Sequence, residues 1–308
     1  MIFSRLSFLN VASGLAFLLA GDAAIRGVHA HGGHGGGGEV PAGEFRVTPV
    51  ITIEGHGGFE TNLDGNPEHY AIDGQFGYVF EWGLPNNGVF AIEGSIGPSA
   101  VYGEAEHFYG IVHAHGDSND HHGDEDHDDD HGHEDEHGHD EHGHAHGSGA
   151  PYKRTDIRGY LAARYQPNDK LALQVAWMPY YVTGKGEEMG EGLKNEVGVN
   201  VTYAFGDGDV DFALGDGLED VIDGVFISVE NRTGWEANGT YIGNYTDLRP
   251  GFGFNVDLLK ITLSGGPRFY SPGSYSGLSS RTDWGGELEM EYSITDNIAL
   301  FAHWEPIH

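Results

Sequence analysis

The chain has 308 residues, and its 51 glycines with 38% apolar residues argue against a helical bundle. Forty-eight acidic against 15 basic residues give a formal net charge of −33, which excludes a direct nucleic-acid surface, because such surfaces need cationic contacts to phosphates. Cations are therefore the expected partners. Cysteine is absent, which excludes disulfides, thiolate metal sites and thiol nucleophiles and suits an exported protein.

The first thirty residues have the pattern of a removable signal peptide. Arg5 supplies the basic start, residues 8–20 are apolar, and small residues permit cleavage after Ala23 or Ala30. A membrane anchor is the weaker interpretation, because the apolar run is shorter than the ~20 residues that a spanning helix needs. No later segment is apolar for long enough to form a transmembrane helix, so a mature protein that enters a membrane must cross it with strands.

Most of the remaining chain alternates with a period of two, which predicts β-strands. In residues 70–84, Ile72 and Phe76 share an apolar face, whereas Asp73 and Glu81 lie on the other face. The same alternation predicts eleven strands, at 45–56, 69–83, 88–102, 155–166, 170–183, 194–206, 224–231, 247–257, 260–269, 283–293 and 297–305.

Bacterial single-chain barrels normally have an even number of strands, so a further strand is expected. The best places for it are the Gly/Asp-rich stretch 207–223 and the residues around Tyr241. The chain also ends on HWEPIH, without the terminal aromatic residue that many outer-membrane barrels carry. The expected number of strands is therefore about 10–12.

The second face of each strand separates a soluble sandwich from a membrane barrel, and here it carries charge. Glu287, Glu289 and Glu291 alternate with apolar residues, and Arg158 and Arg164 do the same in an earlier strand. In a sandwich these charges would simply face water, which is the simpler interpretation. In a membrane barrel they would face the lumen while the apolar face meets lipid.

The lengths of the connections favour the barrel. Short links alternate with long ones, as in outer-membrane barrels with brief periplasmic turns and extended outer loops. The short links are at 84–87, 166–169, 258–260 and 293–297; the long ones start at Glu54, Gly103, Gly184, Glu230 and Tyr270.

Two hairpins, YQPNDKLALQVAW and EYSITDNIALFAHW, resemble strand–turn–strand units of small Gram-negative outer-membrane β-barrel proteins. The resemblance covers essentially everything after the signal peptide and names an architecture, not a subfamily. It implies an all-β, antiparallel, up-and-down transmembrane barrel in the cell outer membrane, in contact with its lipid. The resulting organisation is a signal peptide at 1–30, a Gly/His-rich segment at 31–43, and a barrel at 44–308 that contains a loop at 103–153.

That loop is rich in histidine and acid. It has 13 histidines from His107 to His146 and 13 acids from Asp117 to Glu141, and its first basic residue is Lys153. Such a segment cannot bury enough apolar surface to offset its ordering entropy, so we expect it to be disordered without a ligand. The connectivity places it outside the cell.

Neutral imidazole is a ligand for Zn²⁺, Ni²⁺ and Cu²⁺, and nearby carboxylates attract the ions. Many of the histidines form HxH pairs, whose side chains project to the same side of an extended chain, so each pair can hold one ion. We expect exchangeable binding, with zinc as the most reasonable cargo. The candidate metal ligands are His107, His113, His115, His121, His122, His127, His131, His133, His137, His139, His142, His144 and His146, with His56 and His69 at the strand ends nearby.

Simpler interpretations exist for these histidines. The loop could be a solvated acidic linker or a pH sensor, since metal ions and protons compete for the same nitrogens. A path from the loop into the lumen through His56, His69 and His303 is attractive. The alternative, in which these charges form ion pairs that only fill a narrow barrel, is at least as well supported. Such pairs would join Arg46, Arg158 and Arg164 to Glu54, Glu93, Glu287, Glu289 and Glu291.

The sequence therefore leaves three functions open. The first is a barrel that captures divalent metal on its outer loop and supports uptake, through the lumen or through a periplasmic metal-binding protein. The second is a non-transporting surface metal buffer or adhesin. The third, an outer-membrane enzyme, is disfavoured because the sequence contains no recognisable nucleophile motif.

Overall fold

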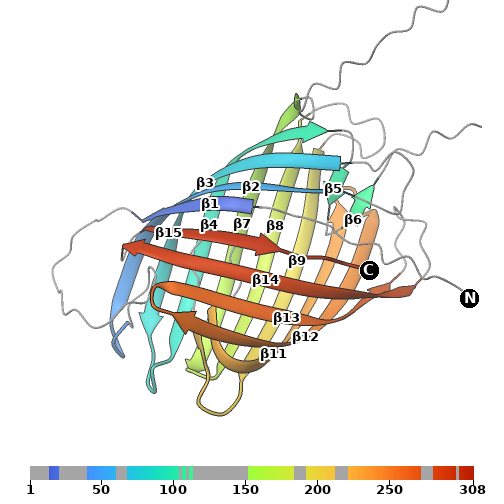
Figure 1. Ribbon diagram of the computed structural model, residues 1–308. Helices are drawn as coiled ribbons and strands as arrows, with labels where there is room; N and C mark the ends of the chain where they lie inside the picture. Colours follow the sequence, from blue (N-terminus) through green and yellow to red (C-terminus); the bar gives the residue numbers. More distant parts are fainter. Residues whose placement is uncertain are drawn as a thin grey trace, which may run out of the picture.

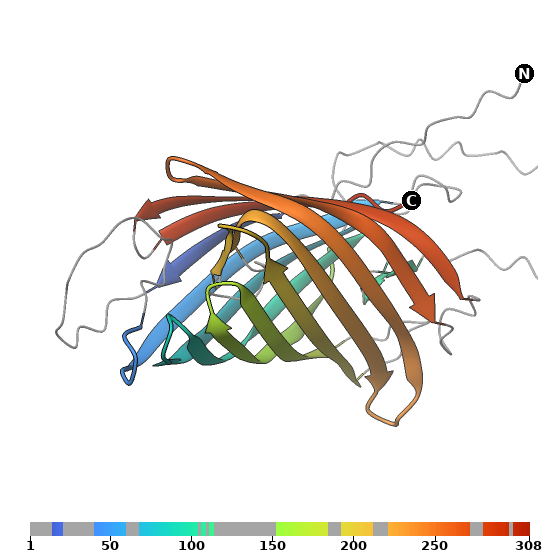
Figure 2. The same cartoon turned by 90° about the horizontal axis from the view of Figure 1, so that it is seen from below.

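The computed structural model describes residues 14–20, 40–59, 68–103, 106–108, 111–113, 152–183, 192–211, 221–271, 280–295 and 298–308. These residues form strands and turns, arranged as a curved sheet that closes on itself (Figures 1 and 2). No described helix is long and apolar enough to cross a bilayer. The strands are β1 (Gly14–Ala20), β2 (Phe45–Phe59), β3 (Glu68–Gly83), β4 (Val89–Gly103), β5 (Glu106–Phe108), β6 (Ile111–His113), β7 (Tyr152–Asn168), β8 (Leu171–Val182), β9 (Gly192–Ala204), β10 (Asp209–Asp211), β11 (Val221–Glu236), β12 (Tyr241–Val256), β13 (Leu259–Ser271), β14 (Arg281–Thr295) and β15 (Ile298–Trp304).

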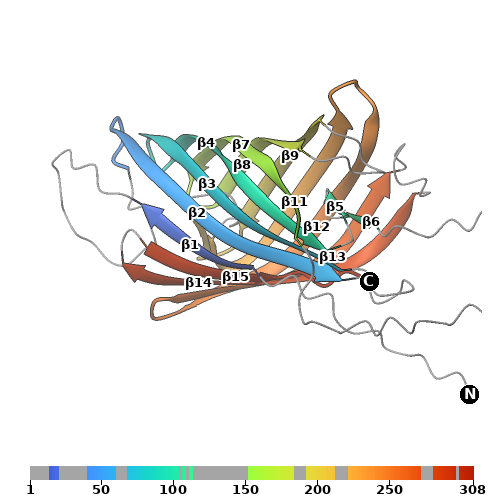
Figure 3. The same cartoon turned by 90° about the horizontal axis from the view of Figure 1, so that it is seen from above.

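The main sheet is an antiparallel up-and-down barrel. Its long strands follow one another in chain order from β2 to β15, and β9 pairs with β11. The seven residues of β1 lie between β15 and β2, antiparallel to both, and complete the ring (Figure 3). The all-β barrel that the sequence predicts is thereby confirmed, and each of the eleven predicted segments is a strand.

The missing twelfth strand is not where the sequence places it. Tyr241 begins β12, which the sequence analysis starts later, and the 207–223 stretch contributes only the three-residue β10. The strand that makes the number even is β1, from the segment predicted to be a signal peptide. Removal of that segment on export stays a prediction.

One connection predicted to be long is a tight turn. β11 continues to Glu236 and β12 begins at Tyr241, so four residues separate them. The outward faces here are polar, which hides the alternation. Asn231 donates to the Thr246 hydroxyl at 2.8 Å and Asn244 donates to the Asn231 amide oxygen at 3.0 Å, so these side chains satisfy each other across the strand pair.

The apolar face of the strands lies on the outside of the barrel, as predicted. Ile96, Phe76 and Tyr78 are 62%, 57% and 55% exposed, whereas Asp73 and Glu81 on the opposite face are buried. Leaving so many large apolar side chains exposed around the ring would be costly in water, so this surface fits lipid. The chain is therefore an outer-membrane-type barrel in architecture.

The two ends of the barrel differ. At the short-turn end, strands are joined by residues 84–88, 169–170 and 257–258. Asn86 and Asn87 have φ near +60°, a conformation that asparagine tolerates better than most residues, which explains the LPNN turn. The opposite end, called the loop end here, carries the connections from β2 to β3, β4 to β7, β8 to β9, β11 to β12 and β13 to β14.

Aromatic side chains mark both ends of the outer surface. Near the short-turn end, Phe45, Trp82 and Phe90 pack in a row with ring centroids 4.9 and 5.5 Å apart. At the loop end, Tyr70 and Tyr102 lie 5.9 Å apart and Tyr152 continues the row. Two aromatic girdles around an apolar band are typical of outer-membrane barrels.

Candidate functional site

Both ends of the His-rich loop are held at the loop end of the barrel. Tyr102 in β4 lies opposite Tyr152 in β7, and their rings are 5.6 Å apart. The loop at 103–153 therefore leaves and re-enters the barrel between two neighbouring strands. The described residues thus place the start and the end of this connection at the loop end, and its assignment as one long outer loop stays a prediction.

The loop begins with a small two-stranded sheet, β5 and β6, that is separate from the barrel sheet. In its register, His113 of β6 lies opposite Glu106 of β5, and His107 lies opposite Val112. The sequence predicts disorder for this part of the loop, whereas residues 106–108 and 111–113 form paired strands. The remaining candidate ligands of the loop lie outside the described residues: His115, His121, His122, His127, His131, His133, His137, His139, His142, His144 and His146.

His56 and His69 lie near the base of the loop. His69 is opposite Gly103, the last residue of β4 before the loop, and its side chain is outside the described part of the chain. His56 Nε2 is 3.1 Å from Asp73 Oδ2, and Arg158 Nη1 is 2.6 Å from the same oxygen. A guanidinium at the shared carboxylate makes this a poor place for a metal ion, because two cations would repel each other.

His303 on β15 makes a similar contact to a carboxylate of the neighbouring strand. Its Nε2 is 3.1 Å from Glu287 Oε1 on β14. Among the residues that the structure describes, no group of three or more His, Asp or Glu is arranged to hold a metal ion. The predicted lumenal path through His56, His69 and His303 therefore finds no ready metal site along its described part.

The inward-facing charges form ion pairs, as the simpler interpretation expects. Arg158 pairs with Glu54 and Arg164 with Glu93, both at 3.7 Å. Arg46 binds Glu81 at 2.7 Å. Further pairs join Arg154 to Asp156, Lys194 to Glu236, Arg232 to Glu196 and Glu230, Arg249 to Glu287, and Lys260 to Glu291.

The densest group of charges was not anticipated from the sequence. Asp247 accepts hydrogen bonds from Arg249 at 2.9 Å and from Arg268 at 2.5 to 2.7 Å, and both guanidiniums also bind Glu305. Arg268 also lies 4.4 Å over the Tyr245 ring. Asp247, Arg249 and Arg268 occupy inward positions in β12 and β13, so period-two alternation was the available signal for them. Glu305 follows the end of β15, and the contacts of the group depend on how these strands are aligned.

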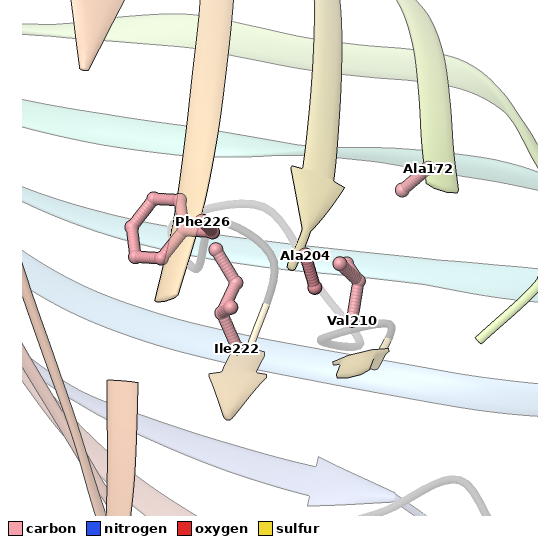
Figure 4. Close-up of a cluster of buried hydrophobic side chains, with 5 residues drawn as sticks. All are labelled: Ala172, Ala204, Val210, Ile222 and Phe226. Carbon is pink, nitrogen blue, oxygen red and sulfur yellow. The ribbon is translucent and has the colours of Figure 1, made fainter. Parts of the chain in front are cut away.

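An apolar cluster lies inside the short-turn end. Ala172, Ala204, Val210, Ile222 and Phe226 are all buried together (Figure 4). Val210 reaches this position because β10 turns back after β9 and pairs with the start of β11. The Val210 carbonyl accepts a hydrogen bond from Gln166 Nε2 at 2.6 Å, which ties β10 to the end of β7. The lumen is thus apolar at this cluster, although the ion pair of Arg46 with Glu81 lies at the same end of the barrel.

One comparison with known proteins gives a match. Residues 213–308, which include β11 to β15, match the family model of the cyanophage outer membrane protein-like β-barrel domain. The match covers less than half of the chain and supports the barrel architecture. No curated protein and no solved structure shows significant similarity to the chain.

Proposed function

We propose that the protein is an outer-membrane barrel that captures divalent transition-metal ions, zinc foremost, on its His-rich loop and supports their uptake. The observation that carries the proposal is the set of 13 histidines at 107–146, interleaved with acids, in the connection between β4 and β7. The barrel holds this connection at the loop end, and the surrounding carboxylates raise the local concentration of cations.

The chemistry of the loop suits capture more than storage. Thirteen imidazoles at two to four per ion correspond to about three to six zinc ions per chain. Each such site lacks the closed cage of a structural zinc centre, so ions can exchange. Because ligands must be deprotonated, the capacity falls as the pH drops below the imidazole pKa.

The location in the outer membrane rests on three supports. The exposed apolar band and the two aromatic girdles fit a bilayer, and the matched family is an outer-membrane-like barrel. The third support is the signal-peptide pattern of residues 1–30. With the longer connections outside, as in other barrels of this kind, the His-rich loop faces the exterior.

A second candidate is a surface metal buffer that does not transport. It is favoured by the ion pairs of the lumen, such as Arg158 with Asp73 and Arg249 with Glu287, which occupy the carboxylates that a passing cation would use. The lumen would then not conduct zinc, and any uptake would depend on hand-over to a periplasmic metal-binding protein. Zinc flux into liposomes that contain the purified barrel, compared with empty liposomes, distinguishes a barrel that conducts zinc from one that does not.

Calorimetric titration of the full chain in detergent with zinc tests the capture itself. In one variant the 13 loop histidines are replaced by asparagine, and in the matched control the 13 loop acids from Asp117 to Glu141 are replaced by asparagine or glutamine. We expect the histidine variant to lose the multi-ion binding and the acid variant to keep the number of ions with weaker affinity at low salt. Equal zinc binding by the histidine variant and the parent would reject the proposal.

A further inference from the structure

The ring of the barrel has one junction that depends on seven residues. Leu19 of β1 lies opposite Ile51 of β2 and also opposite Ile298 of β15. Since β1 is antiparallel to both neighbours, β2 and β15 run in the same direction. Every other neighbouring pair around the ring is antiparallel, from β2 and β3 to β14 and β15.

The same seven residues belong to the segment that the sequence predicts to be removed on export. Loss of Gly14–Ala20 would leave the facing edges of β2 and β15 with unpaired backbone N–H and C=O groups. Each such group costs several kcal/mol in the hydrocarbon region of a membrane, so open edges do not persist there. The two edges must find a partner, and each is the nearest strand to the other.

We propose that β2 and β15 pair directly as parallel neighbours in the exported protein, which then has an eleven-stranded barrel. The pleats of the two strands are compatible. Val50 and Thr52 of β2 are buried on the inward face, and so are Ala299 and Phe301 of β15. A direct pair therefore keeps the apolar face of both strands outside, which a shift by one residue in either strand would reverse.

Closure needs only a modest contraction. Removing one strand of twelve shortens the circumference by about one strand spacing, roughly 4.8 Å. The ten antiparallel junctions keep their registers, and the added rotation is shared among them. An odd number of strands in a membrane barrel is physically attainable, because parallel ladders are only slightly less stable per residue.

The directions of the first and last strands, β2 and β15, agree with an odd number of strands. β2 starts at the short-turn end, next to residues 40–44, where Gly83 N donates to the Glu44 carbonyl. β15 finishes at the loop end, where His308 and Trp284 exchange two backbone hydrogen bonds. The first and last strands of the exported barrel therefore point the same way, as an odd number of strands requires. The inference rests on the proposed export of the chain and not on metal capture.

Engineered cysteine pairs test the junction, and the parent chain has no cysteine to interfere. The seam pairs are Ile51→Cys with Ile298→Cys and Ile51→Cys with Leu300→Cys, which cover two registers. The positive control is Ile51→Cys with Phe76→Cys, which are opposite each other on β2 and β3. The negative control is Ile51→Cys with Ile96→Cys, which lie on either side of β3 through Phe76.

Diamide oxidation of outer membranes, followed by denaturing electrophoresis with and without reductant, reads out the cross-links. Neighbouring strands fall within the Cα separation that a disulfide allows, whereas strands about 9.6 Å apart do not. We expect at least one seam pair to cross-link as fully as the positive control, in protein whose intact mass lacks residues 14–20. Retention of residues 14–20, or seam pairs as unreactive as the negative control, would overturn the inference.

Zinc titration of the same variants keeps this result separate from the proposed function. Folding is checked for each variant by its heat-modifiable mobility, which a closed barrel retains in cold detergent. A seam that fails to cross-link while zinc binding is normal contradicts the eleven-stranded closure alone. Normal cross-linking with absent zinc binding contradicts metal capture alone.

Discussion

The barrel contains histidines in two different settings, and the contrast indicates what each can do. His56 and His303 in the wall lie about one hydrogen-bond length from Asp73 and Glu287, at 3.1 Å in both cases, and Arg158 shares the first of these carboxylates. The histidines of the 103–153 loop instead alternate with glycine and acid in a connection at the rim. Wall imidazoles lie against carboxylates of the barrel, whereas the loop imidazoles occur in numbers that suit the proposed metal capture.

The largest effect is expected from the buried charge group of the wall. Replacing Arg268 with alanine leaves Asp247 without two of its hydrogen bonds and Glu305 without one of its partners, inside the barrel. We expect a loss of about 3–5 kcal/mol in unfolding free energy, with zinc binding unchanged. Urea unfolding in detergent measures it.

Arg281→Ala is the matched control for this variant. Arg281 is also paired with an aspartate, Asp283, but its side chain is 42% exposed at the loop end. An exposed pair contributes about 0–1 kcal/mol, so the control should be nearly neutral. Similar losses for the two variants would contradict the view that the Arg268 group stabilises the wall.

A somewhat smaller effect tests the lipid-facing surface. Ile96 lies in the middle of β4 and is 62% exposed on the outside. Ile96→Arg should lower the free energy of unfolding by about 2–4 kcal/mol if the residue lies at the midplane of a bilayer, and change it by no more than about 0.5 kcal/mol if the surface meets water. Unfolding in lipid vesicles distinguishes a lipid-facing from a water-facing surface. The control is Tyr152→Arg at the rim, which should cost about 0–1 kcal/mol.

How far the sequence predicts this architecture differs between regions for a physical reason. All eleven strands were recognisable because lipid outside and charge inside impose alternation on each strand separately. The turn at 237–240 was hidden because β11 and β12 extend where Asn231 and Asn244 satisfy each other and no apolar face is needed. The pairing of Arg46 with Glu81 was also beyond reach, since it depends on the register between strands.

The smallest effect concerns the wall histidines themselves. His56→Gln keeps a donor near Asp73, and Arg158 continues to bind the same carboxylate at 2.6 Å. We expect a loss of about 0.5–1.5 kcal/mol in unfolding free energy and an unchanged number of bound zinc ions. A loss of zinc ions in calorimetric titration of this variant would mean that the wall takes part in capture and would remove the contrast between the two settings.

Zinc held at the surface of intact cells tests metal capture by the loop most directly. Cells that make the parent chain, and cells that make the variant with 13 loop histidines replaced by asparagine at equal outer-membrane levels, are loaded with zinc and washed. An impermeant chelator then releases the surface zinc for measurement. We predict a releasable pool that is several-fold larger with the parent chain, by about three to six ions per chain. Equal pools from the two kinds of cell would contradict capture by the loop.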